Sequence, residues 1–69
     1  MPLIFAKINQ TYIIKFIRGN DKVIKHINDL GFVVGAEIKP VQKLGGNFII
    51  AVKDSRIAID ESMAKRIIV

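Results

Sequence analysis

The side chains in this sequence that could take part in chemistry are few and widely separated. The chain has a single histidine, His26, and no cysteine. The lack of cysteine excludes thiolate metal sites and cysteine nucleophiles. His26 and Asp29 would lie about one helical turn apart, where the pair could bind a metal ion weakly. Hard divalent cations need more oxygen ligands than this pair offers, so the sequence predicts no metal site.

No arrangement typical of catalysis is present either. Asp60 and Glu61 form the only adjacent acidic pair, but sequence neighbours point in different directions, and capping of a helix explains them better than acid–base catalysis. Ser55 and Ser62 have no evident histidine base. The glycines lack the Lys-Ser/Thr that follows the glycines of a phosphate-binding P-loop. The sequence therefore predicts a protein that is not an enzyme, with no catalytic residue and no cofactor.

The element that these residues surround is a helix expected from Asp21 to Asp29. Its apolar stripe recurs at the spacing of one helix face and consists of Val23, Ile24, Ile27 and Leu30. Asn20 or Asp21 can cap its first turn. Gly31 suits the left-handed position that follows many helices, and Gly35 suits a tight turn. The pattern predicts a helix that ends in a structural corner.

The rest of the chain favours short strands. They are expected at Tyr12–Ile17, Glu37–Lys43, Phe48–Val52, Arg56–Ile59 and Ile67–Val69, because β-branched and aromatic residues fit a pleated sheet. Pro40 cannot donate to a ladder, so its strand should lie at an edge or carry a bulge. A short helical turn is expected at residues 60–65. Together these elements predict a mainly β fold, a small closed barrel of about five strands with one inserted helix.

The aromatic residues bear on whether such a barrel binds nucleic acid. A net charge of +5 permits contact with nucleic acid, an anionic membrane surface or an acidic protein patch, although the basic residues are scattered. Base stacking would need exposed rings. Of Tyr12, Phe16, Phe32 and Phe48, we expect at least three in the core and Tyr12 partly exposed; Leu3 and Phe5 should also reach the core. A small RNA-associated barrel remains the alternative function.

Length and composition limit the organisation and location of the chain. Sixty-nine residues predict one domain, residues 1–69. The longest apolar stretches are far shorter than the roughly 20 residues of a spanning helix. The first residues lack the charged and apolar regions of a signal peptide. We therefore expect a cytoplasmic protein without direct membrane insertion.

The order of several apolar and glycine-rich segments is similar to a known family. The segments are Met1-Pro2-Leu3, Asp29-Leu30-Gly31-Phe32, Gly35-Ala36-Glu37-Ile38, Gly45 to Val52, Arg56-Ile57-Ala58-Ile59, and Ala64 with Ile67-Ile68-Val69. In this order and spacing the whole chain resembles the FeoA family of bacterial ferrous iron transport. It departs from the family pattern at Asn9, Ala6 and Pro40.

The resemblance implies an SH3-like barrel without catalysis. It also implies a role in supporting or regulating FeoB, the membrane iron transporter with a cytosolic GTP-binding domain. The same domain resembles the C-terminal domain of iron-dependent repressors. No DNA-binding helix-turn-helix precedes it in this chain, so the transport role is the preferred expectation.

The surface expected to contact a partner is the helix with its corner. Its residues are Lys22, Lys25, His26, Asp29 and the exposed parts of Phe32 and Val34. An ordinary solvated helix face explains the same residues equally well. A further alternative is a weak homo-oligomer formed through an uncovered strand edge near Pro40.

Overall fold

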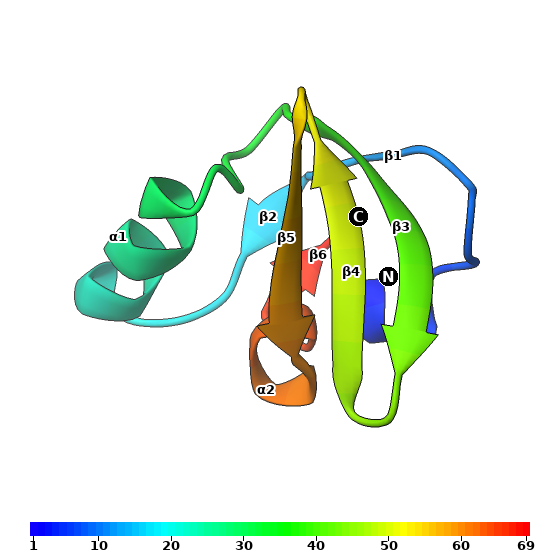
Figure 1. The fold of residues 1–69 in the computed structure, drawn as a ribbon. Coiled ribbons are helices and arrows are strands. Elements are labelled where there is room, and N and C mark those ends of the chain that lie inside the picture. Colours follow the sequence, from blue (N-terminus) through cyan, green and yellow to red (C-terminus); the bar gives the residue numbers. More distant parts are fainter.

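The alternating apolar residues of the second half of the chain build three strands of a four-stranded antiparallel sheet (Figure 1). The computed structural model describes residues 1–69. The strands are β1 (Tyr12–Ile13), β3 (Glu37–Leu44), β4 (Asn47–Val52) and β5 (Ser55–Asp60), in the order β1-β3-β4-β5. Two tight turns join β3, β4 and β5. In β4 every second side chain is buried, namely Phe48, Ile50 and Val52, so one face of the sheet forms the floor of the core.

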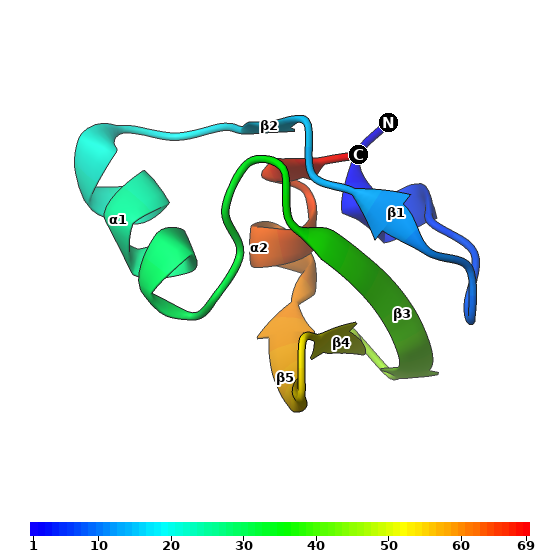
Figure 2. The same cartoon turned by 90° about the horizontal axis from the view of Figure 1, so that it is seen from above.

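A second, two-stranded sheet lies across this core. It pairs β2 (Phe16–Ile17) with β6 (Ile67–Ile68), and Pro2 forms a bridge to Ile68. The two chain ends lie side by side in both views (Figures 1 and 2). The amino group of Met1 donates to the Val69 carbonyl at 2.7 Å, and the Val69 N–H donates to the Met1 carbonyl at 2.7 Å. Antiparallel pairing of the first and last segments thus completes the barrel.

The expected continuous strand at Tyr12–Ile17 is wrong, because the chain changes its pairing partner in the middle. Its first part pairs with β3 and its second part with β6. Between them, the Ile14 N–H donates to the Ala36 carbonyl at 3.0 Å and the Ile14 carbonyl accepts from the Gly35 N–H at 2.7 Å. The segment therefore forms two short strands, one in each sheet, instead of one strand. The side chains before and after this bend do not lie on one common face.

Helix α1 (Asp21–Asp29) has the predicted bounds and cap. The Asn20 side chain accepts from the Val23 N–H at 2.9 Å. At the other end, the Gly31 N–H donates to the Asn28 carbonyl at 2.9 Å and the Phe32 N–H to the Ile27 carbonyl at 3.3 Å. This pair of bonds is a Schellman motif, and it requires the left-handed conformation that Gly31 adopts at φ +108°. Only Ile27 of the helix is fully buried.

The strand that contains Pro40 carries a bulge, which was one of the two predictions for it. The register of β3 with β4 shifts between Pro40 and Gln42. The other reading, an edge strand, is wrong: β1 pairs with β3 on its second side, and the Pro40 carbonyl accepts from the Asn9 N–H. Asn9 has φ +67°, consistent with the predicted turn. The strand edge near Pro40, which was expected to be uncovered, therefore has a backbone partner at Pro40, namely Asn9.

The predicted C-terminal turn is the helix α2 (Glu61–Ala64), which the Asp60 side chain caps by accepting from the Met63 N–H at 2.8 Å. The aromatic residues differ from expectation. Phe32 and Phe48 are buried, but Phe16 is 56% exposed, and Phe5, in the short 3-10 helix η1 (Leu3–Phe5), is 71% exposed. Fewer rings therefore reach the core than predicted. None of the helices has the length and apolar character needed to cross a membrane.

Candidate partner-binding site

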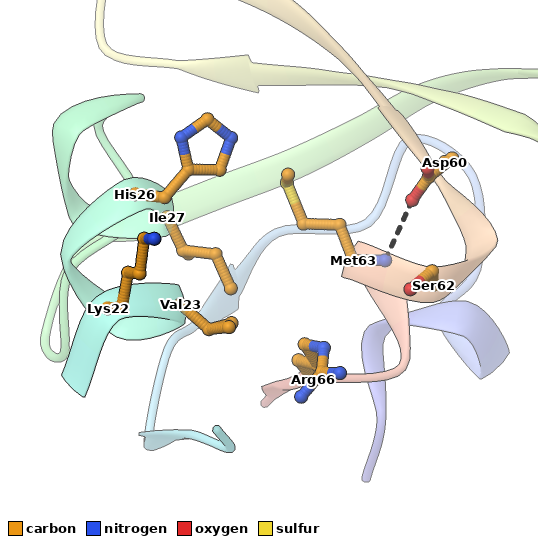
Figure 3. A pocket seen from close by; sticks show the side chains of 8 residues that line it. All are labelled: Lys22, Val23, His26, Ile27, Asp60, Ser62, Met63 and Arg66. Carbon is orange, nitrogen blue, oxygen red and sulfur yellow. Dashed lines mark hydrogen bonds between the residues drawn. The ribbon is translucent and has the colours of Figure 1, made fainter. Parts of the chain in front are cut away.

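The two helices face each other across an open cleft of about 320 Å³ (Figure 3). One wall comes from α1 and the other from the end of β5, from α2 and from the residues after it. The lining residues are Lys22, Val23, His26, Ile27, Asp60, Ser62, Met63 and Arg66. Segments about 40 residues apart in sequence thus form the same concave surface.

The cleft has an apolar floor. Ile27 and Met63 extend toward each other from the two helices in Figure 3, and Val23 continues the floor on the α1 side. Val23 and Met63 are only partly buried and pack against the core. An apolar surface that remains partly accessible gains free energy when another apolar group covers it. The floor therefore suits an apolar side chain of a partner.

The edges of the cleft are polar and mainly basic. Lys22 and His26 lie on the α1 side, and Arg66 lies at the end beyond α2. Asp60 supplies the one acidic group, and one of its oxygens already accepts from the Met63 N–H. Two permanent positive charges thus oppose one negative charge. The arrangement favours a partner that combines apolar and acidic groups.

Gly19 allows the two walls to approach each other. The Arg18 N–H donates to the Arg66 carbonyl at 2.7 Å, which holds the segment before α1 against the segment before β6. A Cβ atom at Gly19 would lie 2.9 Å from Val23 Cγ1 and 3.4 Å from an Arg66 guanidinium nitrogen, and the residue has φ +141°. Only glycine fits this close approach without strain. Gly19 is a residue whose role the sequence analysis missed.

Five of the six predicted contact residues are exposed and fall into three groups. Lys22 and His26 line the cleft. Lys25 and Asp29 form an exposed ion pair with Nζ to Oδ2 at 3.1 Å on the outer side of α1. Val34 is 63% exposed in the corner after the helix. These five side chains are accessible to a partner.

The expectation that Phe32 presents an exposed part is wrong. Its side chain is fully buried. In a Schellman motif the residue after the left-handed glycine commonly makes an apolar contact with the third residue before the helix end, and here these are Phe32 and Ile27, both in the core. Phe32 therefore supports the surface from below.

The cleft also contains functional candidates that sequence reasoning missed. Met63 and Arg66 come from the C-terminal segment and reach the cleft only through the pairing of β2 with β6. The one local signal was Lys65-Arg66, the single pair of adjacent basic residues. No group of three or more histidine, aspartate or glutamate side chains is gathered in a way that could hold a metal ion.

The class of protein follows from the way the two sheets close around one core. A structure of Stenotrophomonas maltophilia FeoA in complex with zinc, described as an SH3 domain protein, has a TM-score of 0.82 to this chain, with 28% identity, and covers 99% of this chain and 87% of that one. A manganese-dependent transcriptional repressor has a TM-score of 0.84 at 11% identity and covers 97% of this chain but 39% of that one. The latter shows the fold alone. The fold is an SH3-like barrel.

The family follows from the sequence comparisons. The FeoA domain model matches residues 1–69. A candidate Fe(2+) transport protein A of Methanocaldococcus jannaschii is 32% identical over 68 residues, which cover 99% of this chain and 83% of that protein. A crystal structure of the iron uptake regulatory protein FeoA has a TM-score of 0.88 at 27% identity, covering 96% and 88% of the two chains. This chain belongs to the FeoA family, whose function lies in ferrous iron transport.

Proposed function

We propose that this chain is a non-enzymatic accessory protein that binds the cytosolic part of a FeoB-type ferrous iron transporter. Membership of the FeoA family supplies the link to iron transport. The structural observation that carries the proposal is the cleft between α1 and α2, which has an apolar floor and basic edges. Such a surface suits recognition of another protein. The site of action is the cytoplasm, at the inner face of the membrane that holds the transporter.

The contact surface in this proposal is the cleft together with the exposed side of α1 and the corner. Lys22, His26 and Arg66 attract an acidic segment of the transporter, and Met63 with Val23 receives an apolar side chain. The exposed residues Lys25, Asp29 and Val34 extend the same surface on the solvent side. A desolvated apolar centre surrounded by polar contacts is the usual design of a protein interface.

The test is a calorimetric titration of this chain into the purified cytosolic domain of the co-encoded transporter. The variant Lys22→Glu with Arg66→Glu should weaken binding at least about tenfold, because it reverses two charges at the cleft edge. The variant Lys39→Glu with Lys53→Glu changes the net charge equally on exposed residues outside the cleft, and it should bind within about twofold of the original chain. Circular dichroism confirms that both variants fold.

Two results would overturn the proposal in different ways. No binding of the original chain to the transporter domain would refute the proposed partner. Binding that is lost equally in both charge-reversed variants would keep the partner and refute the cleft as the contact site, because only the net charge would then matter.

One observation favours the alternative of RNA binding. Phe16 is exposed on the two-stranded sheet, between Lys15 and Arg18, both exposed as well. An exposed ring beside basic groups is the arrangement used for base stacking. Labelled RNA titrated into the chain at low salt tests this alternative, which requires binding that falls steeply with added salt and weakens in Phe16→Ala. No measurable binding at low salt would remove it.

A further inference from the structure

Strand β5 leaves one side of the main sheet open. All six of its residues pair with β4, and the strand ends the order β1-β3-β4-β5. The backbone bonds of turns, loops and caps and the side-chain hydrogen bonds do not involve the backbone of residues 55–59, whereas the carbonyl of Asp60, the N-cap residue of α2, accepts the first bond of that helix. Figure 2 shows β5 at the end of the sheet, with no strand beside it on the side away from β4. Such an edge is a template for another strand.

The turn before β5 determines which backbone groups point outward. Val52 and Ser55 enclose a two-residue turn and face each other in the ladder. The residues that close such a turn form a hydrogen-bonded pair. Bonded and non-bonded pairs alternate along an antiparallel ladder, and the β4–β5 register has no shift. Ser55, Ile57 and Ile59 therefore bond to β4. The N–H and C=O groups of Arg56 and Ala58 and the N–H of Asp60 therefore point away from β4 and are free, whereas the Asp60 carbonyl is bonded to α2.

We propose that this edge pairs with the same edge of a second copy of the chain. The two β5 strands would run antiparallel about a twofold axis at Ala58, so that Ala58 lies opposite Ala58 of the second copy. Arg56 then lies opposite Asp60 of the second copy, and Asp60 opposite Arg56. The Ala58 pair gives two backbone hydrogen bonds, and each Arg56–Asp60 pair gives one, from the Asp60 N–H to the Arg56 carbonyl, which makes about four new bonds. The result is one continuous sheet through both copies.

The side chains of the edge are complementary to themselves in this register. On the outer face, two Arg56–Asp60 pairs lie on either side of the small Ala58 pair. Arg56 has no ion-pair partner within the chain, and only Oδ1 of Asp60 is engaged, by the Met63 N–H, which leaves Oδ2 for the guanidinium. On the inner face, the half-buried Ile57 lies opposite Ile59 of the second copy. Unlike charges and apolar pairs directly opposite each other stabilise antiparallel strands.

The neighbouring registers are unfavourable for the same reason. A twofold axis at Arg56 would place Arg56 opposite Arg56, and an axis at Asp60 would place Asp60 opposite Asp60. Like charges directly opposite each other are destabilising. An axis at Ile57 would make Ile57 opposite Ile57 a non-bonded pair and would bond Arg56 to Ala58 on each side, which leaves Arg56 and Asp60 without unlike charges opposite them. Among symmetric pairings centred within β5, only the axis at Ala58 combines free backbone groups with unlike charges.

The test is sedimentation equilibrium of the purified chain from about 10 µM to about 1 mM, because an interface of one strand per copy is small and associates weakly. We expect monomer at the low end and dimer at the high end. Arg56→Asp and Asp60→Arg should each associate at least about tenfold more weakly, since two unlike pairs become two like pairs. An equal mixture of the two variants restores both unlike pairs and should form heterodimers. Lys7→Asp, which changes an exposed residue outside β5, is the charge control for Arg56→Asp.

A second pair of variants tests the backbone bonds without changing charge. Ala58→Pro removes an N–H that points away from β4, a position at which an edge strand tolerates proline; it should abolish dimers, whereas Ala58→Thr should keep them. Circular dichroism checks the fold of every variant, including Asp60→Arg, which loses the cap of α2. A monomer at 1 mM, association unchanged in Arg56→Asp, or a mixture that does not associate would each overturn the proposal.

Discussion

The main sheet and helix α1 differ in how firmly each is held by the core. Strands β3, β4 and β5 bury the side chains of Ile38, Phe48, Ile50, Val52 and Ile59, whereas α1 buries only Ile27 completely. Both ribbon views place α1 at one side of the molecule (Figures 1 and 2). A helix of nine residues is not stable alone in water. It therefore depends on its two ends, the close approach at Gly19 and the corner that contains Phe32.

This difference indicates how stability and recognition are divided. The barrel carries most of the apolar core, and the region with the smaller share of it provides one wall of the cleft. Segments with few buried apolar contacts open locally at a lower free energy than the core. The proposed contact surface thus belongs to the part of the molecule that can adjust most easily to a partner.

The largest expected effect comes from the corner that holds α1 to the barrel. Phe32→Ala should lower the free energy of unfolding by about 3–5 kcal/mol, because it removes a fully buried ring. Val34→Ala, two residues further on and exposed, should change it by less than about 0.5 kcal/mol. Urea unfolding of both variants measures the difference. Equal effects would contradict the assignment of Phe32 to support and of Val34 to the surface.

A smaller effect should appear when the cap of α1 is removed. Asn20→Ala loses the bond to the Val23 N–H and should cost the helix about 1 kcal/mol, whereas Asn20→Ser keeps a capping oxygen. If α1 opens separately from the barrel, its amides should exchange about fivefold faster in Asn20→Ala, with little change in β4. Hydrogen exchange followed by NMR measures both regions. Equal acceleration in β4 would show that helix and barrel open together.

The smallest effect is expected on the solvent side of α1. Lys25 and Asp29 are exposed and one helical turn apart, and such pairs contribute about 0.3–0.5 kcal/mol. A double-mutant cycle with Lys25→Ala and Asp29→Ala should find a coupling within this range, and added salt should reduce it. A coupling of several kcal/mol would show that the pair holds α1 in place and would contradict the division drawn above.

The parts of the fold that local sequence signals determine could be predicted. The bounds of α1 follow from its apolar stripe, the Asn20 cap and Gly31, and α2 follows from the capping residue Asp60. Each of these signals lies within a few residues of the structure that it determines. The bulge at Pro40 was predictable for the same reason, because proline lacks the N–H that a regular ladder needs.

The features that depend on distant pairing could not be predicted in this way. The bend between β1 and β2 arises because Ile14 bonds to Gly35 and Ala36, and nothing near Ile14 in the sequence shows this. The exposure of Phe16 follows from its place on the outer face of the small sheet formed with β6. The cleft has the same origin, since Met63 and Arg66 meet α1 only after the barrel closes.

The paired chain ends make this barrel a suitable insert for another protein. Because Met1 and Val69 bond to each other in both directions, both ends leave the molecule at one point, and a host loop could receive the barrel without being stretched. The same adjacency permits circular permutation, in which a short linker joins the ends and new ends are opened at Gly45–Gly46 between β3 and β4. In a permuted chain of this kind, the strands would follow one another in a different order in the sequence and would keep their order in the sheet.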